Sequence, residues 1–224
     1  MKPTERDIAG MFDVISGRYD MLNHILSGYT DVRWRKRVAK LSLDRPVKDI
    51  LDVSTGTGDL AAAFRRTSGN VRTFGLDISM EMLKIAGNKS MELRRINGSA
   101  LSLPFRDNTF DLVSCAFGIR NIYPRERGLQ EFFRVTKPEG RLVILEFSMP
   151  RGVFGTIYKL YFDRILPLLG NLLSGTTAYS YLQSSVEAFP DPQTFSGMLT
   201  SAGFQNIRIT SLTRGIATIY LCEK

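Results

Sequence analysis

Two glycines and an aspartate carry the first chemical signal in this sequence. Gly56 and Gly58 stand in LDVSTGTGDLA (51–61), between an apolar run and the start of a helical pattern. Glycines at such a point let the backbone turn sharply, and the helix that follows directs its free N–H groups there. Asp77 ends the next apolar run, where a carboxylate accepts hydrogen bonds from two ribose hydroxyls. A glycine pair alone is often a plain turn, but this combination predicts a nucleoside site.

The loop departs from the dinucleotide pattern G-x-G-x-x-G at two positions. Ala61 takes the place of the third glycine, and Asp59 puts a carboxylate in the first helical turn, where it would repel a pyrophosphate. Both departures favour a ligand that has no phosphate and carries a cationic end. We therefore expect S-adenosyl-L-methionine, which combines an adenosine with an amine and a sulfonium.

A third cofactor contact is expected in NGSALSLPF (97–105), which follows the third apolar run. Ala100 is small enough to lie against an adenine ring, and Ser99 can hydrogen-bond to that ring. The alternative is an ordinary loop that leads into RDNTFD (106–111).

Short apolar runs alternate with helical patterns from residue 47 onward. The expected strands are 48–55, 71–79, 91–98, 110–117 and 141–148, and the expected helices are 59–67, 79–88 and 124–136. This alternation predicts a parallel sheet with crossover helices. Two last strands, 205–212 and 217–223, are linked only by TRGI, so they must form an antiparallel hairpin. Class I methyltransferases end their sheet in this way.

We therefore predict a single α/β domain with the class I S-adenosylmethionine-dependent methyltransferase (Rossmann-like) fold and a seven-stranded sheet. Its expected parts are an N-terminal helical cap (1–45), a cofactor-binding core (46–150), a helical insertion (151–190), and a final helix with the hairpin (191–224). The final helix has clear limits, because Asp191 can cap it, Pro192 suits its first turn and Gly203 can end it.

The composition is that of a globular protein with a basic surface. The 224 residues carry a net charge of +8, which is spread along the chain rather than gathered in one arm. The densest cluster, RWRKR (33–37), is best explained as a solvated helix face, so we expect no nucleic acid partner. No stretch is long enough for a membrane span, and MKPTERDIAGMF lacks the apolar segment of a signal peptide. These features predict a cytoplasmic protein, and Cys115 and Cys222 lack metal-ligand spacing.

Four stretches resemble the bacterial quinone-biosynthesis C-methyltransferases, the family of demethylmenaquinone methyltransferase and 2-polyprenyl-6-methoxy-1,4-benzoquinol methylase. They are MFDVISGRYDMLNHILSGYTDVRWRK (11–36), the glycine loop, FGIRNIYPRERGLQEFFRVTKPEGRLVILEFSMP (117–150) and YLQSSVEAFPDPQTFSGMLTSAGF (181–204). The resemblance implies methylation of a ring carbon in a prenylated hydroquinone. It also implies cofactor contacts above the glycine loop, at Thr57, Asp77, Ser99 and Ala100. Ser99 stands where Asp or Asn is usual in the family.

Arg120 and Asn121 follow the predicted strand 110–117, at the sheet edge where ligands bind in such folds. A neutral hydroquinone carbon is a modest nucleophile, and ionisation of the neighbouring hydroxyl activates it. A guanidinium can lower the pKa of that hydroxyl, which is about 10 in phenols, and Asn121 can hold the other ring oxygen. The alternative is structural: Arg120 pairs with Asp20 or Glu146, and Asn121 caps the helix 124–136.

Other side chains are weaker candidates for the site. His24, the single histidine, can serve as a general base or be a packing residue, and Tyr19 and Asp20 can close over the cofactor or pack within the cap. Glu146 can meet the acceptor or Arg120. The aromatic residues of the insertion suit a prenyl tail or pack over the sheet; they are Tyr158, Tyr161, Phe162, Tyr179 and Tyr181.

Several functions remain open at this level. We favour demethylmenaquinol as the acceptor because the chain is short at its N-terminus; a polyprenyl benzoquinol, a sterol-like lipid, a small phenol or RNA are the alternatives. A non-catalytic S-adenosylmethionine-binding regulator and a nicotinamide oxidoreductase are further possibilities. A prenylated acceptor lives in a bilayer, so we expect transient contact with the inner membrane surface through the basic charge and the helices of 153–173. The sequence leaves open whether the chain forms a homodimer.

Overall fold

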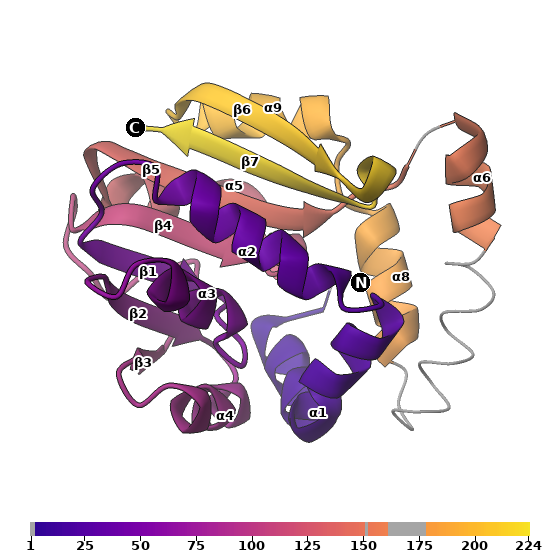
Figure 1. Ribbon diagram of the computed structural model, residues 1–224, viewed down its shortest axis with the longest axis horizontal. Coiled ribbons are helices and arrows are strands. Elements are labelled where there is room, and N and C mark those ends of the chain that lie inside the picture. Colours follow the sequence, from indigo (N-terminus) through magenta and orange to yellow (C-terminus); the bar gives the residue numbers. More distant parts are fainter. Residues whose placement is uncertain (1–2, 151, 161–177) are drawn as a thin grey trace.

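The computed structural model describes residues 3–150, 152–160 and 178–224, and seven strands of these ranges form one sheet. Their order is β3-β2-β1-β4-β5-β7-β6 (Figure 1). The strands are β1 (Asp49–Val53), β2 (Arg72–Asp77), β3 (Arg94–Asn97), β4 (Phe110–Ala116), β5 (Thr136–Phe147), β6 (Gln205–Leu212) and β7 (Ala217–Glu223). Strands β1 to β5 pair in parallel, and β7 runs antiparallel to both β5 and β6. The predicted class I fold with its terminal hairpin is confirmed.

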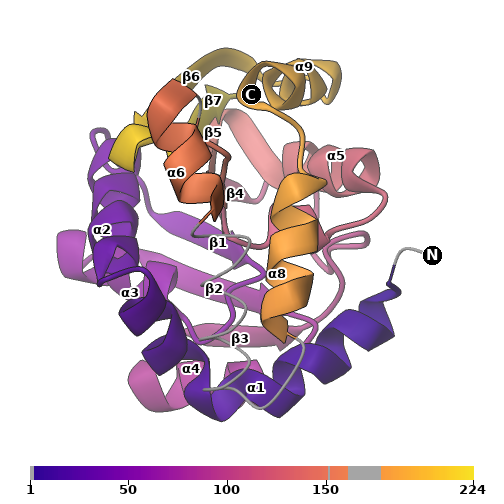
Figure 2. The ribbon, with the colours of Figure 1, turned by 90° about the vertical axis from the view of Figure 1, so that its right-hand side faces the viewer.

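Helices cover both faces of the sheet (Figure 1). One face carries α2 (Thr30–Ser42), α3 (Asp59–Thr67) and α4 (Met80–Lys89), and the other carries α5 (Arg125–Val135) and α9 (Pro192–Ser201). Figure 2 looks onto the edge at which the parallel strands end, where α1 (Glu5–Leu26), α6 (Gly152–Leu160) and α8 (Ala178–Glu187) gather. These three helices lie over the ends of the strands, where a ligand crevice is expected.

Two apolar layers bury the sheet. To one layer α2 and α3 contribute Trp34, Val38, Leu60 and Phe64. To the other α5 and α9 contribute Leu129, Phe132, Phe195 and Leu199. Because helices cover both faces, the central strands need apolar side chains on both sides. This explains the continuous apolar run of β4, in which Leu112, Val113 and Cys115 have no exposed surface.

Strand β5 differs from its prediction. It begins at Thr136, five residues before the expected start, and its register with β4 shifts between Phe110 and Leu112. Glu139 has a φ of 61°, so the segment 137–140 forms an irregular start of the strand rather than a loop before it. The final helix agrees with its prediction, since the Asp191 carboxylate accepts N–H hydrogen bonds from Gln193 and Thr194.

Within the described ranges, none of the helices combines the length and the apolar character that a membrane crossing requires.

Candidate active site

A small cavity of about 60 Å³ lies at the ends of β1, β2 and β4. Three of the predicted cofactor residues, Gly56, Asp77 and Ala100, lie in its wall. Gly98 and Gly118 line it as well. These small residues lie among larger apolar side chains such as Leu76, Met82 and Ile122, and they let a flat ring system approach the backbone closely.

Asp77 is held by main-chain hydrogen bonds. Its Oδ2 accepts the N–H of Gly56 at 2.8 Å and its Oδ1 accepts the N–H of Ser79 at 2.9 Å. Burial raises the pKa of this carboxyl, and the two N–H groups act in the opposite direction. Each carboxylate oxygen can accept more than one hydrogen bond, so Asp77 keeps capacity for the hydroxyls of a ribose.

The stretch that follows β4 is shaped by close packing against the glycine loop. A Cβ atom on Gly118 would lie 2.4 Å from the Cβ of Ser54, a distance that real Cβ atoms do not reach. Only glycine therefore lets the two loops pass. Phe117 before it has a φ of 57°, a left-handed conformation that costs a non-glycine residue about 1–2 kcal/mol. The strain brings the Phe117 ring into the wall of the small cavity.

Helix α1 is tied to the loops around this cavity by three carboxylates. Glu5 accepts from the hydroxyl of Ser99, Asp13 from Ser79, and Asp20 from Thr57, each at 2.5 Å. Lys89 forms ion pairs with both Asp20 and Asp59.

These bonds change the picture of three predicted cofactor residues. Thr57 and Ser99 are absent from the cavity wall, and their hydroxyls bond to α1 instead. Gly58 is also absent from the wall; it precedes α3 with a φ of 82°, and a Cβ there would lie 3.2 Å from the Cβ of Ala86. The hydrogen bonds of Thr57 and Ser99 to α1 are long-range contacts that no local sequence pattern indicates, and the cofactor roles of all three residues stay predictions.

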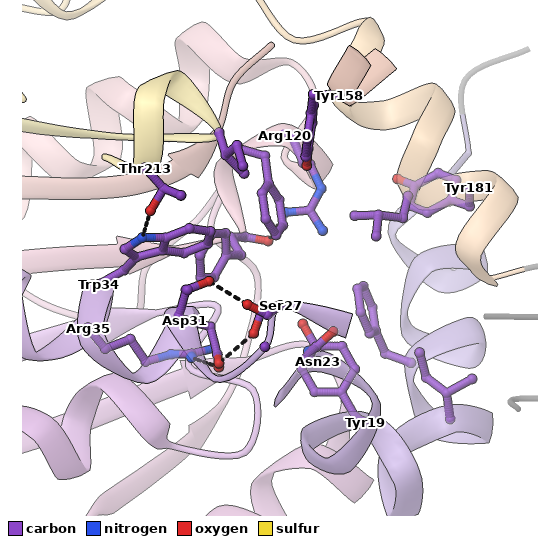
Figure 3. Close-up of a pocket in the computed structure, with 18 of the residues that line it drawn as sticks. Tyr19, Asn23, Ser27, Asp31, Trp34, Arg35, Arg120, Tyr158, Tyr181 and Thr213 are labelled. Atoms are coloured by element: carbon purple, nitrogen blue, oxygen red, sulfur yellow. Dashed lines mark hydrogen bonds and ion pairs between the residues drawn. The ribbon is translucent and has the colours of Figure 1, made fainter. Parts of the chain in front are cut away.

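A second, larger cavity of about 360 Å³ opens beside the first (Figure 3). Most of its wall is aromatic or aliphatic, and includes Met11, Ile15, Trp34, Phe147, Tyr158, Tyr181, Leu182 and Ile216. Phe12, Tyr19 and Phe117 line both cavities, so the two are contiguous. Of the predicted tail-binding aromatics, Tyr158 and Tyr181 face this space; Tyr161 and Phe162 lie outside the described residues, and so does the side chain of Tyr179.

Arg120 reaches the larger cavity from the turn η1 (Ile119–Asn121) after β4 (Figure 3). Its Nη1 donates to Glu146 Oε1 at 2.9 Å and to the carbonyl of Phe117, and its Nε donates to Ser185 Oγ at 3.3 Å. The pair with Glu146 is buried, with side chains 5% and 0% exposed. Among the described residues Nη2 has no acceptor.

Of the structural roles considered for Arg120 and Asn121, only the one for Arg120 is found. Arg120 does pair with Glu146, as one alternative held, whereas Asp20 bonds to Thr57 and Lys89. Asn121 does not cap α5, because Pro124 precedes that helix without a side-chain cap. Its Oδ1 instead accepts from the hydroxyl of Tyr181 at 3.0 Å, and Asn121 lines the smaller cavity. The two candidates thus stand on either side of the junction.

Asp31, which sequence reasoning missed, is a buried carboxylate in the wall of the larger cavity. It accepts from Ser27 Oγ at 2.8 Å, from Arg35, and from His24 Nδ1 at 2.8 Å (Figure 3 shows the first two). Burial alone would raise the pKa of Asp31, but these three partners together hold it below its usual value. His24, a weaker candidate for a general base, lies behind this carboxylate and is absent from the cavity wall.

One group of possible metal ligands occurs in the described residues, His24, Asp31 and Asp59. Arg35 stands between the two carboxylates, bonded to Asp31 and 3.9 Å from Asp59. The guanidinium supplies the positive charge that a cation would otherwise bring.

The residues of the small cavity suit the chemistry of the cofactor, but the volume of the cavity is smaller than a ligand of that size needs. Ligands of nucleoside size need pockets of roughly 300 Å³ or more, well above the 60 Å³ between the sheet edge and α1. The glycine floor and Asp77 belong to the sheet, whereas the opposite wall includes Glu5, Ile8 and Phe12 of α1. Because strand pairing fixes the sheet side, a ligand larger than this cavity would have to displace the α1 side.

The fold and these two contiguous cavities define a class I S-adenosylmethionine-dependent methyltransferase. The whole chain, residues 1–224, matches the model of the ubiE/COQ5 methyltransferase family. It is 46% identical over 220 residues to demethylmenaquinone methyltransferase of Thermus thermophilus, a match that covers 96% of this chain and 100% of the relative. It is 44% identical to the ubiquinone/menaquinone biosynthesis C-methyltransferase UbiE of Geotalea daltonii, with 97% and 96% covered. The chain belongs to the ubiE/COQ5 methyltransferase family.

Solved structures with little sequence identity share the fold. The cyclase SpnF superposes with a TM-score of 0.74 at 17% identity, over 99% of this chain and 97% of SpnF. A methyltransferase of Thermotoga maritima, described as a possible histamine N-methyltransferase, gives a TM-score of 0.70 at 16% identity, over 96% of this chain and 99% of the other. Proteins with such different activities show that this fold by itself does not determine the reaction.

Proposed function

We propose that this chain is an S-adenosylmethionine-dependent C-methyltransferase of quinone biosynthesis, which converts demethylmenaquinol to menaquinol. The observation that carries the proposal is the pair of contiguous cavities. One has a glycine floor and a ribose-binding carboxylate, and the other has an apolar wall with a buried arginine at the junction. Membership of the ubiE/COQ5 family supports the same reaction.

The bound cofactor supplies an electrophilic methyl group on a sulfonium. Asp77 holds the ribose, and the strained loop of Phe117 and Gly118 sets the floor between the two ligands. Arg120 places positive charge beside the acceptor hydroxyl, which favours the ionised form and so raises electron density on the neighbouring ring carbon. That carbon would form the new bond as the methyl–sulfur bond breaks, with the electron pair of the broken bond left on the sulfur of the departing thioether. The proton of the methylated carbon would then be released to solvent as the ring regains aromaticity.

Exclusion of water is the second task of the protein. The larger cavity is lined by aromatic side chains, and in such surroundings a fixed charge acts on the acceptor more strongly than it would in water. The same apolar wall suits the first units of a prenyl chain. Tyr19 lies at the junction, and burial of its hydroxyl raises its pKa, although Arg120 and Arg35 act in the opposite direction. Tyr19 therefore stays protonated and can donate to an acceptor oxygen.

The substrate's membrane location leads to a proposal about the protein surface. Val14 and Met21 on α1 and Tyr29 before α2 are exposed at 75%, 52% and 60%. Arg33 and Lys36 on α2 are exposed close by in the chain. We propose that these apolar and basic side chains make transient contact with an anionic bilayer, from which the acceptor enters.

The test is methyl transfer from labelled S-adenosylmethionine to defined acceptors in detergent or vesicles. We expect transfer to demethylmenaquinol and little to the polyprenyl benzoquinol. If the benzoquinol alone is methylated, the acceptor is wrong while the reaction class stands. If neither hydroquinone is methylated although calorimetry shows cofactor binding, the proposed reaction is wrong.

A further inference from the structure

Helix α8 contacts the turn that carries Arg120 and Asn121. The turn η1 has only three residues of 3₁₀ geometry, which is too short to fix side chains by itself. Helix α8 is anchored by the buried Val186, with Leu182 packed against it. From this anchored helix two hydroxyl groups reach the turn.

The first hydroxyl belongs to Tyr181. It donates to Asn121 Oδ1 at 3.0 Å, and the bond crosses the junction, because Tyr181 lines the larger cavity and Asn121 the smaller one. An amide whose oxygen accepts this bond directs its NH₂ group away from Tyr181. In this structure the bond thus holds the amide with its oxygen toward Tyr181 and its NH₂ group directed away.

The second hydroxyl belongs to Ser185. It donates to the carbonyl of Leu182 at 2.9 Å, so its lone pairs remain to accept the Nε–H of Arg120 at 3.3 Å. Glu146 and the Phe117 carbonyl hold Nη1 of the same guanidinium. With two of its three nitrogens fixed, the guanidinium can present only Nη2 to an acceptor.

We propose that Tyr181 and Ser185 are positioning residues for methyl transfer, which act through Asn121 and Arg120. Helix α8 also walls the acceptor cavity, so the element that receives the acceptor sets the orientation of the reacting turn. This inference rests on the proposed function. The competing explanation is that the two hydroxyls only stabilise the packing of α8.

A double-mutant cycle separates the two explanations for Tyr181. Tyr181→Phe should lower kcat about tenfold, the effect of losing one orienting hydrogen bond, and should leave the cofactor Kd within about threefold. In an Asn121→Ala background the same change should have no further effect, since its target is gone. An equal loss in both backgrounds, or no loss in the first, overturns the proposal for Tyr181.

Ser185 has a matched control on the same helix. Ser184 also donates to a carbonyl one turn back, that of Tyr181 at 3.0 Å, but is exposed and does not bond to Arg120. Ser185→Ala should lower kcat about threefold and move the rise of kcat with pH to higher pH, because a misplaced guanidinium lowers the acceptor pKa less. Ser184→Ala should change neither quantity. Equal behaviour of the two variants overturns the role of Ser185.

A readout without turnover keeps this inference separate from the proposed function. The side-chain NH₂ signals of Asn121 can be identified in nitrogen-edited NMR spectra by their loss in Asn121→Ala. Tyr181→Phe should shift or broaden this pair, whereas Tyr29→Phe, on an exposed tyrosine, should not. If the two Asn121 NH₂ signals do not move in Tyr181→Phe, the positioning role is overturned even if methyl transfer occurs. If the wild-type protein methylates no hydroquinone, the proposed function fails while this signal still tests the contact.

Discussion

The two cavities that meet at Tyr19 and Phe117 are built in opposite ways. On its sheet side the smaller one exposes the backbone of several glycines, and main-chain N–H groups hold the carboxylate of Asp77. The larger one is built from side chains of several helices, and its charged groups are held by other side chains, as Glu146 holds Arg120. A site made of backbone changes only if the sheet changes, whereas a site made of side chains can change by substitution. If the cavities hold cofactor and acceptor as proposed, the first can serve many methyl acceptors, and the second selects one.

A buried carboxylate near each cavity shows the same contrast. Asp52, beneath the glycine loop, accepts hydrogen bonds from the hydroxyls of Thr55 and Ser114, and burial raises its pKa to about 6. Asp31, in the wall of the larger cavity, has Arg35 and His24 as partners, and its pKa is lowered despite burial. Burial thus disfavours the carboxylate charge beneath the glycine loop, whereas ion pairs stabilise it beside the larger cavity.

The largest expected effect tests the backbone-built site. Asp77→Ala should raise the cofactor Kd by several hundredfold to about a thousandfold, since two hydrogen bonds to a charged group are lost. Titration calorimetry measures this directly. Thr213→Val changes the wall of the larger cavity, where Thr213 accepts the Trp34 N–H at 2.9 Å, and should leave the cofactor Kd unchanged. Unaltered affinity in Asp77→Ala would remove the ribose role.

The next effect tests the side-chain-built site. Arg120→Ala should lower kcat by about a hundredfold to several hundredfold, which is the usual cost of removing one group that stabilises developing negative charge. The cofactor Kd should change less than threefold, because Arg120 is absent from the wall of the smaller cavity. Single-turnover transfer at saturating cofactor separates the two quantities. Normal turnover in this variant would contradict the phenolate role.

Arg120→Ala leaves Glu146 buried and unpaired, which by itself costs about 3–5 kcal/mol of stability. The double variant Arg120→Met/Glu146→Gln removes both charges and should restore folding without restoring transfer. If the double variant unfolds at the wild-type temperature, as followed by circular dichroism, and its turnover is still low, the loss of methyl transfer is due to chemistry rather than to unfolding.

The same contrast explains what the sequence could predict. The strands, the terminal hairpin and the positions of Gly56, Asp77 and Ala100 follow from periodicity and from the order of elements, which are local or topological properties. The larger cavity, the Tyr181–Asn121 bond and the links of Ser99 and Thr57 to α1 join residues 37 to 94 positions apart. Such contacts depend on how helices pack, and no local pattern encodes them. The roles given to the site residues stay predictions that the variants described here test.

A smaller effect concerns the stability of the cofactor site with pH. The pKa of Asp52 is about 6 in the folded protein, above the ordinary value of 3.8 for an aspartate, so between these pH values the folded state binds more protons than the unfolded state. Its contribution to the free energy of unfolding is therefore present below about pH 4 and is lost as pH rises to about 6, by about 2–3 kcal/mol. Asp52→Asn mimics the protonated form and should lack this loss.

The measurement is denaturant unfolding of the wild type and Asp52→Asn at pH 4, 5, 6 and 7. The difference between the two proteins isolates Asp52 from carboxyls such as Asp31 and Asp111, whose lowered pKa values act in the opposite direction. The free energy of unfolding of the variant, relative to that of the wild type, should increase from pH 4 to pH 7. If it does not, ionisation of Asp52 costs the folded protein little stability.

The smallest effect concerns α1, the element that faces the backbone floor. Glu5 and Asp13 bond to Ser99 and Ser79, and the cavity behind them is smaller than the cofactor requires. If α1 must move for binding, Glu5→Gln/Asp13→Asn should raise the cofactor association rate about threefold, because weaker neutral bonds open more often. Stopped-flow fluorescence measures the rate, and Val14→Ala, an exposed position on the same helix, should leave it unchanged. An unchanged or slower rate in the double variant would mean that the cofactor enters without opening these two contacts.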